Sequence, residues 1–336
     1  MKKTLILISV AAAALSLSSC AKHDALKTND INKRYLDSWL KIYHPGAVED
    51  PSGVFILNET PGTGKSLKDP EACPYLYFTY TKQDLDGNIS ETTDARIAQQ
   101  IGTYDENVYY GPIVTGRSAK EITAGKEKMF ESMNVGGTRT VLVPGWFDTM
   151  NRYGKTKDYF ENVTGTDAIF TIHVIDTFSN IDKWQVDSIE RYLARNYMEK
   201  VDSVKYGYYY IQTKAPDTTD SFEETASVTI NYTGGLLNGT IFDTTLENRA
   251  KDAGLYSKGK TYSPANVTLA KDYKEIKLGG STIIEGFSYC ISQMKAGEKG
   301  RVIFISKYGY GSSSQDNIPS YSPLWFDIEM IGLEKE

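Results

Sequence analysis

The chain has 336 residues, of which 40% are hydrophobic and 24% are charged, and its formal net charge is −6 at pH 7. The length indicates more than one domain, and the hydrophobic share excludes an intrinsically disordered chain. The acidic balance disfavours nucleic acid as a partner, because domains that bind nucleic acid present basic faces.

Residues 1–20 have the pattern of a bacterial export signal that ends in a lipidation site. Two lysines precede an apolar stretch, residues 4–15, which is too short to span a membrane. The segment ends in Leu17-Ser18-Ser19-Cys20, which resembles a lipobox. We therefore expect lipid on Cys20 and a membrane-anchored chain in the cell envelope, facing the periplasm or the surface. The alternative is an ordinary secretory signal with a chance cysteine.

Two amphipathic helices are expected, one in residues 21–49 and one in a linker, residues 179–205. In the first, apolar residues recur every four positions, at Ile31, Tyr35, Trp39 and Tyr43. In the second, the same spacing is found at Ile189, Leu193, Tyr197 and Val201, and Val204 follows three positions later. The first helix should end near His44-Pro45-Gly46 and the second near Gly207.

Each helix is followed by a long segment, and the two segments, residues 50–178 and 206–336, read alike. Alternating strands place Leu76, Phe78 and Tyr80 on one face in the first copy, and the corresponding residues 152 positions later are Val228, Ile230 and Tyr232. Asp86-Gly87 and Asn238-Gly239 are hairpin dipeptides.

Both copies continue with a short helix and two more strands. The helical stretches are residues 125–133 and 286–294, and the strands that follow them are residues 140–143, 169–175, 301–304 and 325–331. The repeat predicts an α+β fold with two similar domains, each an antiparallel sheet with one short crossing helix.

The second copy resembles the FKBP family of peptidyl-prolyl cis-trans isomerases over about 130 residues. The family's ordered motifs are found here as Tyr232-Thr233-Gly234, Phe242-Asp243, Ile283-Ile284-Glu285-Gly286-Phe287, Met294-Lys295-Ala296-Gly297-Glu298, Tyr308-Gly309-Tyr310-Gly311, Ile318-Pro319 and Leu324-Trp325-Phe326-Asp327. The resemblance implies a strongly curved antiparallel sheet wrapped over a short helix, with proline bound between them.

The resemblance also assigns roles to residues of this chain. The floor and sides of the proline site would be Phe287, Ile283, Ile284, Ile318 and Phe326. The catalytic residues would be Asp243, which lies beside the imide, Tyr310, and the aromatic walls Tyr232 and Phe242. The Ile284 backbone N–H and the Tyr310 hydroxyl would each hold a substrate carbonyl. The floor is Phe287 where many relatives have tryptophan, and Gly309 replaces the usual alanine.

This chemistry requires no cofactor and no metal, because rotation about an X-Pro bond breaks no bond. Its barrier, about 18–20 kcal/mol, comes from amide resonance, and apolar surroundings favour the less polar twisted imide. His23, His44 and His173 have no ligand spacing, so no metal site is expected. Gly62-Thr63-Gly64-Lys65-Ser66 resembles half of a phosphate-binding loop, but Glu59 replaces the first glycine, and a turn is expected instead.

The first copy keeps the framework of the second but lacks the aromatic residues of its site. Lys126 stands at the position of Phe287, and Ser90 at that of Phe242. We therefore expect residues 50–178 to fold without isomerase activity. The segment 244–278 is longer than a minimal family member requires, and we expect it to overhang the site.

The leading hypothesis for function is a prolyl isomerase that assists the folding of exported, proline-containing polypeptides. The alternatives are a non-catalytic envelope chaperone that binds peptides, and a scaffold lipoprotein whose helices pair two copies of the chain. Cys73 and Cys290 are expected to be buried and unpaired.

Overall fold

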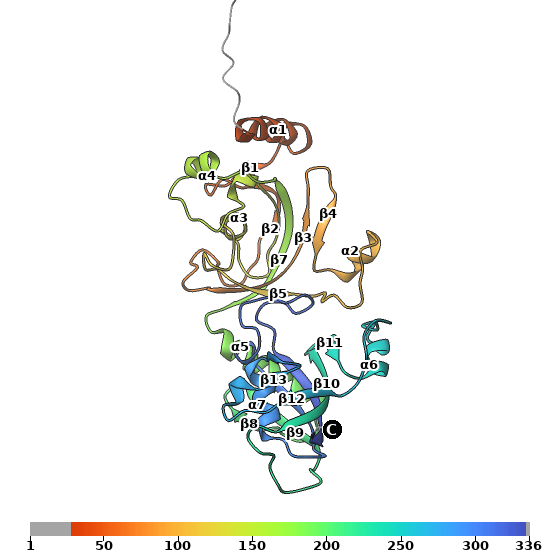
Figure 1. Cartoon of the computed structure of the whole chain (residues 1–336). Coiled ribbons are helices and arrows are strands. Elements are labelled where there is room, and N and C mark those ends of the chain that lie inside the picture. Colours follow the sequence, from red (N-terminus) through yellow and green to blue (C-terminus); the bar gives the residue numbers. More distant parts are fainter. Residues whose placement is uncertain (1–27, 334–336) are drawn as a thin grey trace, which may run out of the picture.

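A computed structural model describes residues 28–333, which form two antiparallel sheets, each with its own hydrophobic core (Figure 1). The two sheets lie one beyond the other along the molecule, with helix α5 (Ile181–Asn196) at the boundary between them. The predictions for residues 1–20, including Cys20, lie outside the described residues. Within residues 28–333, no helix has both the length and the apolarity to cross a membrane.

The first sheet has seven strands in the order β1-β2-β6-β7-β3-β4, and β5 pairs with β3. Its strands are β1 (Val48–Glu49), β2 (Phe55–Thr60), β3 (Tyr75–Gln83), β4 (Ile89–Thr92), β5 (Ile113–Gly116), β6 (Thr138–Val143) and β7 (Ala168–Phe178). The second sheet has nine strands in the order β14-β13-β12-β10-β16-β15-β9-β8, and β11 pairs with β10. Its strands are β8 (Ser203–Lys205), β9 (Tyr208–Lys214), β10 (Ser227–Leu236), β11 (Ile241–Thr244), β12 (Ala265–Thr268), β13 (Lys277–Leu278), β14 (Ser281–Thr282), β15 (Lys299–Phe304) and β16 (Leu324–Leu333).

The seven strands of the first sheet have counterparts in the same order in the second, which adds β13 and β14, and the central pairings share register shifts. Tyr80 of β3 pairs with Ile172 of β7, and Tyr232 of β10 pairs with Ile328 of β16. The pairings of β3 with β4 and of β10 with β11 shift register at equivalent positions. Such bulges bend and twist a strand, so the same curvature is introduced at the same place in both sheets. The predicted α+β fold class with two similar domains is confirmed.

Helix α1 (Thr28–Tyr43) ends where the sequence predicts, but it buries a different face. The apolar residues that it buries are Leu36, Trp39 and Leu40. The residues of the predicted stripe that remain exposed are Ile31, Tyr35 and Tyr43. Because a helix has 3.6 residues per turn, a stripe spaced strictly by four drifts around its surface and leaves the buried face.

Helix α5 is shorter than predicted, because it ends at Asn196 and not near Gly207. Val204 belongs instead to β8, which turns at Gly207, with φ 70°, into β9. Valine favours strands, and glycine tolerates this backbone conformation, so the segment forms a tight hairpin. The predicted face of α5 is confirmed at Ile189 and Leu193, which are buried against the second sheet.

One short helix covers the inner face of each sheet. Helix α7 (Glu285–Gln293) matches its predicted range closely. Its counterpart α3 (Ala124–Lys128) is shorter than the predicted 125–133, and Ser132 turns the chain at φ 61°. The remaining helices are α2 (Ala95–Gln100), α4 (Thr156–Asn162) and α6 (Glu247–Asp252), and the 3-10 turns are η1 (Gly145–Phe147), η2 (Tyr273–Glu275) and η3 (Ser306–Tyr308).

The long segment 244–278 has a counterpart in the first domain that the sequence reasoning missed. In the second domain, α6 leads into a loop closed by Tyr256 and Tyr262, whose rings stack at 5.6 Å. In the first domain, α2 leads into a loop where Tyr104 and Tyr110 stack at 5.2 Å. In each loop the hydroxyl of the second tyrosine accepts a backbone N–H. The equal spacing of the two tyrosine pairs was the signal available in the sequence.

Two smaller predictions are also confirmed. Cys73 and Cys290 are both buried and unpaired. The glycine-rich stretch at Gly64 is part of the connection between β2 and β3, where its N–H donates to the Val135 carbonyl at 3.0 Å. It is therefore packed as a turn.

Candidate active site

An aromatic cluster lies where α7 packs on the inner face of the second sheet. Phe287 of α7 and Phe326 of β16 are its centre, and their exposed fractions are only 3% and 4%. Their rings stack with centroids 4.5 Å apart and an interplanar angle of 23°. The residue predicted as the floor therefore lies directly against one predicted as a wall.

Two half-buried rings extend this cluster from the β10–β11 hairpin. Tyr232 meets Phe287 edge-on at 5.3 Å, and Phe242 meets Phe326 edge-on at 5.6 Å. Gly234 makes this possible, because a Cβ there would lie 2.6 Å from both the Phe242 and the Phe326 ring. The glycine of the Tyr-Thr-Gly motif is thus explained by ring packing, since any larger residue would displace the rings.

Asp243 is held at the edge of the cluster by three donors. Its Oδ2 accepts a hydrogen bond from the Tyr232 hydroxyl at 2.5 Å, and its Oδ1 accepts one from the Thr244 backbone N–H at 2.9 Å. The Lys260 ammonium lies 3.0 Å from the same Oδ1. Burial, followed by the hydrogen bond to Asp243, raises the pKa of Tyr232 above its ordinary value. The Tyr232 hydroxyl therefore stays protonated and fixes the carboxylate.

Two hydrogen-bond donors at this site remain unused within residues 28–333. The Tyr310 hydroxyl is half-buried and donates to none of these residues, and the backbone N–H of Ile284 is likewise unpaired among them. Burial, and then the negative charge of Asp243, raises the pKa of Tyr310, so its hydroxyl keeps its proton at neutral pH. Both groups are available to donate to carbonyl oxygens of a ligand.

The structure brings the predicted apolar and aromatic site residues together in the second core. Buried members of this core are Phe287, Phe326 and Ile318, and half-buried residues packed against it are Tyr232, Phe242, Ile283, Ile284 and Tyr310. Asp243 joins them through its hydrogen bond to Tyr232. Their individual roles remain predictions.

Sequence reasoning missed the part that Lys260 plays here. It lies in the loop closed by Tyr256 and Tyr262, and its ammonium reaches back to Asp243. Segment 244–278 therefore reaches the site, as expected, through the contact between Lys260 and Asp243. No sequence motif marks Lys260, because the contact depends on how the loop folds back over β11.

The equivalent place in the first domain is a cavity of about 510 Å³, whose lining includes charged side chains. Lys126 and Ser90 line it, at the positions of Phe287 and Phe242. The tyrosine–carboxylate pair survives, because the Tyr80 hydroxyl donates to Glu91 at 2.8 Å. Burial raises the pKa of Glu91, but hydrogen bonds from Lys82 and Tyr80 outweigh it and leave that pKa below its ordinary value. The first domain therefore keeps the framework and has a lysine and a serine in place of two aromatic rings.

Comparison with known proteins points to one family for the second domain. Residues 219–331 match the family model described as FKBP-type peptidyl-prolyl cis-trans isomerase. The chain is 31% identical over 137 residues to the FKBP-type peptidyl-prolyl cis-trans isomerase FkpA of Buchnera aphidicola, covering 41% of this chain and 45% of that protein. It is 23% identical over 261 residues to human peptidyl-prolyl cis-trans isomerase FKBP9, covering 77% of this chain and 35% of that one. The chain thus spans less than half the length of these relatives.

Two solved structures that the chain matches are FKBP proteins. FkpA from Escherichia coli is 21% identical with a TM-score of 0.32, over 46% of this chain and 62% of that one. The three FKBP domains of wheat FKBP73 are 15% identical with a TM-score of 0.30, over 85% of this chain and 97% of that one.

Proposed function

We propose that this chain catalyses cis/trans isomerisation of X-Pro bonds, because residues 219–331 match the family model described as FKBP-type peptidyl-prolyl cis-trans isomerase. The observation that carries the proposal is the aromatic cluster around Phe287 and Phe326, with two unused donors beside it. The substrates we propose are proline-containing polypeptides, in particular exported proteins that are still folding.

The proposed mechanism uses the cluster to exclude water from the imide. Rotation removes amide resonance and leaves a less polar, twisted bond, which apolar rings accommodate better than water does. The Tyr310 hydroxyl and the Ile284 N–H would hold the flanking carbonyls in the twisted geometry. Each additional 1.4 kcal/mol, roughly, of preference for this state over the ground state accelerates rotation about tenfold.

In this mechanism Asp243 organises the site and takes no proton. Its carboxylate already accepts from Tyr232 and from the backbone of Thr244, and it pairs with Lys260. Rotation about the X-Pro amide bond breaks no bond, so it requires neither a nucleophile nor a base. Asp243 therefore acts by fixing the Tyr232 ring against Phe287.

The experiment is exchange spectroscopy on a short peptide with an apolar residue before proline, with and without micromolar full-length protein. We expect faster exchange with wild type and loss of the acceleration in Phe287→Ala. Phe147→Ala is the matched control, because Phe147 is as buried but lies in the first core. Both changes remove a buried ring and destabilise by about 3–5 kcal/mol, but only Phe287→Ala should abolish catalysis in the folded protein. An exchange rate that wild type leaves unchanged would refute the proposed activity.

We further propose that Cys20 is lipidated and anchors the chain in the cell envelope. The support is the lipobox-like Leu17-Ser18-Ser19-Cys20 after a short apolar stretch. In the native host, the protein should label with a radioactive fatty acid and sediment with membranes, and Cys20→Ser should abolish both. Unlabelled wild-type protein in the soluble fraction would contradict the anchor.

We also propose that two copies of the chain can pair through α1. The support is the exposed apolar face of this helix, where Ile31 and Tyr35 are 54% and 55% exposed. Analytical ultracentrifugation should show a dimer that Ile31→Glu dissociates. A monomer at every accessible concentration would exclude pairing.

A further inference from the structure

A cavity lies between the two domains, away from the aromatic cluster. Its volume is about 830 Å³. Three parts of the chain enclose it: the first sheet, helix α5, and the second domain from the β10–β11 turn to the 319–323 loop. Pockets between domains are common ligand sites, and this volume is within the range that ligands occupy.

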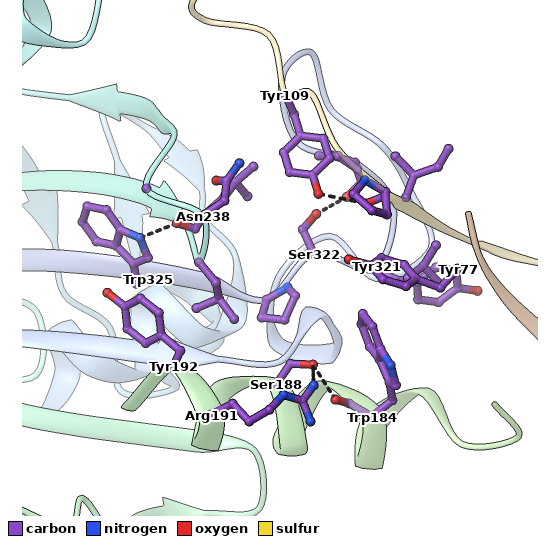
Figure 2. A pocket seen from close by; sticks show the side chains of 18 of the residues that line it. Tyr77, Tyr109, Trp184, Ser188, Arg191, Tyr192, Asn238, Tyr321, Ser322 and Trp325 are labelled. Carbon is purple, nitrogen blue, oxygen red and sulfur yellow. Dashed lines mark hydrogen bonds between the residues drawn. The ribbon is translucent and has the colours of Figure 1, made fainter. Parts of the chain in front are cut away.

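Aromatic side chains line both ends of this cavity (Figure 2). At one end Trp184 of α5 packs against Tyr77 of β3, with ring centroids 5.1 Å apart. At the other end lie Tyr192 of α5 and Trp325 of β16. Rigid rings of this kind bury apolar side chains with little loss of conformational entropy.

Four arginines line the cavity, and three of them have no acidic partner among residues 28–333. Arg301 is engaged, because its guanidinium forms two bonds to Asp327, at 2.6 and 2.7 Å. Arg191 donates only to the Ser188 hydroxyl, at 3.0 Å, and the exposed side chains of Arg195 and Arg249 form no ion pair within this range. The lining contains a single carboxylate, Asp176. This site is therefore cationic in a chain whose net charge is −6.

The spacing of these arginines fits an extended chain. Arg191 and Arg195 are one helical turn apart on α5, which is about 5–6 Å along the axis. Alternate residues of an extended polypeptide lie about 6.6 Å apart and point to the same side. We propose that the cavity binds an extended polypeptide segment in which acidic residues alternate with apolar or aromatic ones, with its carboxylates on the arginines and its apolar side chains between the rings.

This site is separate from the proposed isomerase site, although the two share β16. Trp325 lines the cavity and Phe326 belongs to the aromatic cluster, and successive side chains of a strand point to opposite faces. The segment bound in the cavity therefore needs no proline. Single-stranded nucleic acid also binds arginines and aromatic rings, but the acidic charge of the whole chain opposes it.

The test uses full-length protein and two proline-free peptides that alternate Phe or Leu with a charged residue, one with Glu and one with Lys. Fluorescence anisotropy gives affinity, and quenching of tryptophan emission reports occupancy, since Trp184 and Trp325 both line the cavity. The combined variant Arg191→Gln, Arg195→Gln and Arg249→Gln should bind the Glu peptide about tenfold or more weakly. Arg34→Gln is the matched control, because Arg34 is exposed on α1 and lines no part of the cavity.

We expect the Glu peptide to bind, the Lys peptide to bind much more weakly, and affinity to fall as salt rises. The triple arginine variant should isomerise X-Pro peptides at the wild-type rate, so a failure of the isomerase proposal would leave the binding result intact. Equal affinity for the two peptides, or unchanged affinity in the triple variant, would overturn the proposal. Displacement of the Glu peptide by a single-stranded oligonucleotide would assign the cavity to a different ligand.

Discussion

Gly234 and Phe242 depend on each other for packing, and comparison with the equivalent residues of the first domain supports this. A Cβ at Gly234 would lie 2.6 Å from the Phe242 ring. The equivalent residues of the first domain are Lys82 and Ser90, where a small side chain replaces the ring and a large one replaces the glycine. The two positions have therefore changed together, which supports packing as the cause of the glycine.

This pairing predicts that Gly234→Ala reduces isomerase activity. The new methyl group would push Phe242 and Phe326 apart and cost about 1–3 kcal/mol, as overpacking of a dense core does. Gly259→Ala is the control, because a Cβ there meets nothing within 4 Å. Exchange spectroscopy and thermal unfolding of both variants provide the measurement. Full activity in a stable Gly234→Ala protein would show that ring packing at this position is irrelevant to catalysis.

Residues of the site could be predicted from the sequence where a motif fixes them. Phe287, Phe326 and Tyr232 occur in ordered motifs, and each lies in the expected cluster. Lys260 and the cavity arginines could not be predicted, because their positions depend on how loops and domains pack, and surface arginines carry no periodic signal. Sequence patterns reflect the requirements of strands and helices, and they carry little information about contacts made by loops or between domains.

At the scale of elements, the two sheets show that one framework tolerates two chemically different inner surfaces. Tyr80 and Phe170 lie 6.4 Å apart in the first domain, and Tyr232 and Phe326 lie 6.4 Å apart in the second. The strands therefore place equivalent rings alike. Two ring positions differ: the short helix supplies Lys126 or Phe287, and the hairpin strand supplies Ser90 or Phe242. The framework sets the geometry, and these residues set how apolar the inner surface is.

The first domain should therefore have no isomerase activity of its own. Lys126 lines the cavity, and an ammonium requires hydration, so we expect the twisted imide to gain nothing there over bulk water. In a full-length chain with Phe242→Ala and Phe287→Ala, exchange should fall to the uncatalysed rate. Circular dichroism would verify that this double variant is folded. Residual activity that disappears on adding Tyr80→Ala would locate catalysis in the first domain and refute this account of the cluster.

Helix ends were the least predictable elements. The sequence placed the end of α5 near Gly207, but the chain leaves the helix at Asn196 and forms β8. Apolar residues at Val201 and Val204 continue the helical spacing by coincidence, and strand pairing with β9 outweighs it. Pairing between strands cannot be predicted from a short stretch of sequence alone, because it depends on the rest of the fold.

At the scale of the whole molecule, the domains are joined by contacts that reach the proposed active site. The Tyr321 hydroxyl donates to Glu121 of the first domain, and its ring meets Tyr75 edge-on at 5.4 Å. Its backbone N–H donates to the carbonyl of Gly311 at 2.8 Å, next to Tyr310. A second contact joins the tyrosine-closed loops, where the Asn107 amide donates to the Gly254 carbonyl at 3.2 Å. The first domain thus contacts the loop that carries the Tyr310 hydroxyl, one of the two unused hydrogen-bond donors.

This arrangement predicts a measurable coupling between Tyr321 and Glu121. Tyr321→Phe keeps the ring and the backbone φ of 60° and removes only the hydroxyl. Because a hydrogen bond to a charged group contributes about 1.5–3 kcal/mol, Tyr321→Phe and Glu121→Gln should each lower the free energy of unfolding by a similar amount. Combined, they should cost clearly less than their sum, since both remove the same bond.

The same variants test whether the first domain positions the Tyr310 loop. If it does, Tyr321→Phe should also raise the Michaelis constant for an X-Pro peptide, because a looser loop holds the Tyr310 hydroxyl less well at the substrate carbonyl. Tyr308→Phe is the control, because its hydroxyl bonds within the second domain, to the Tyr206 carbonyl at 3.2 Å. Chemical denaturation gives the coupling energy, and exchange spectroscopy at several peptide concentrations gives the kinetic constant. Additive losses of stability would show that the bond does not join the domains, and coupled stability with unchanged kinetics would show that it joins them without positioning the loop.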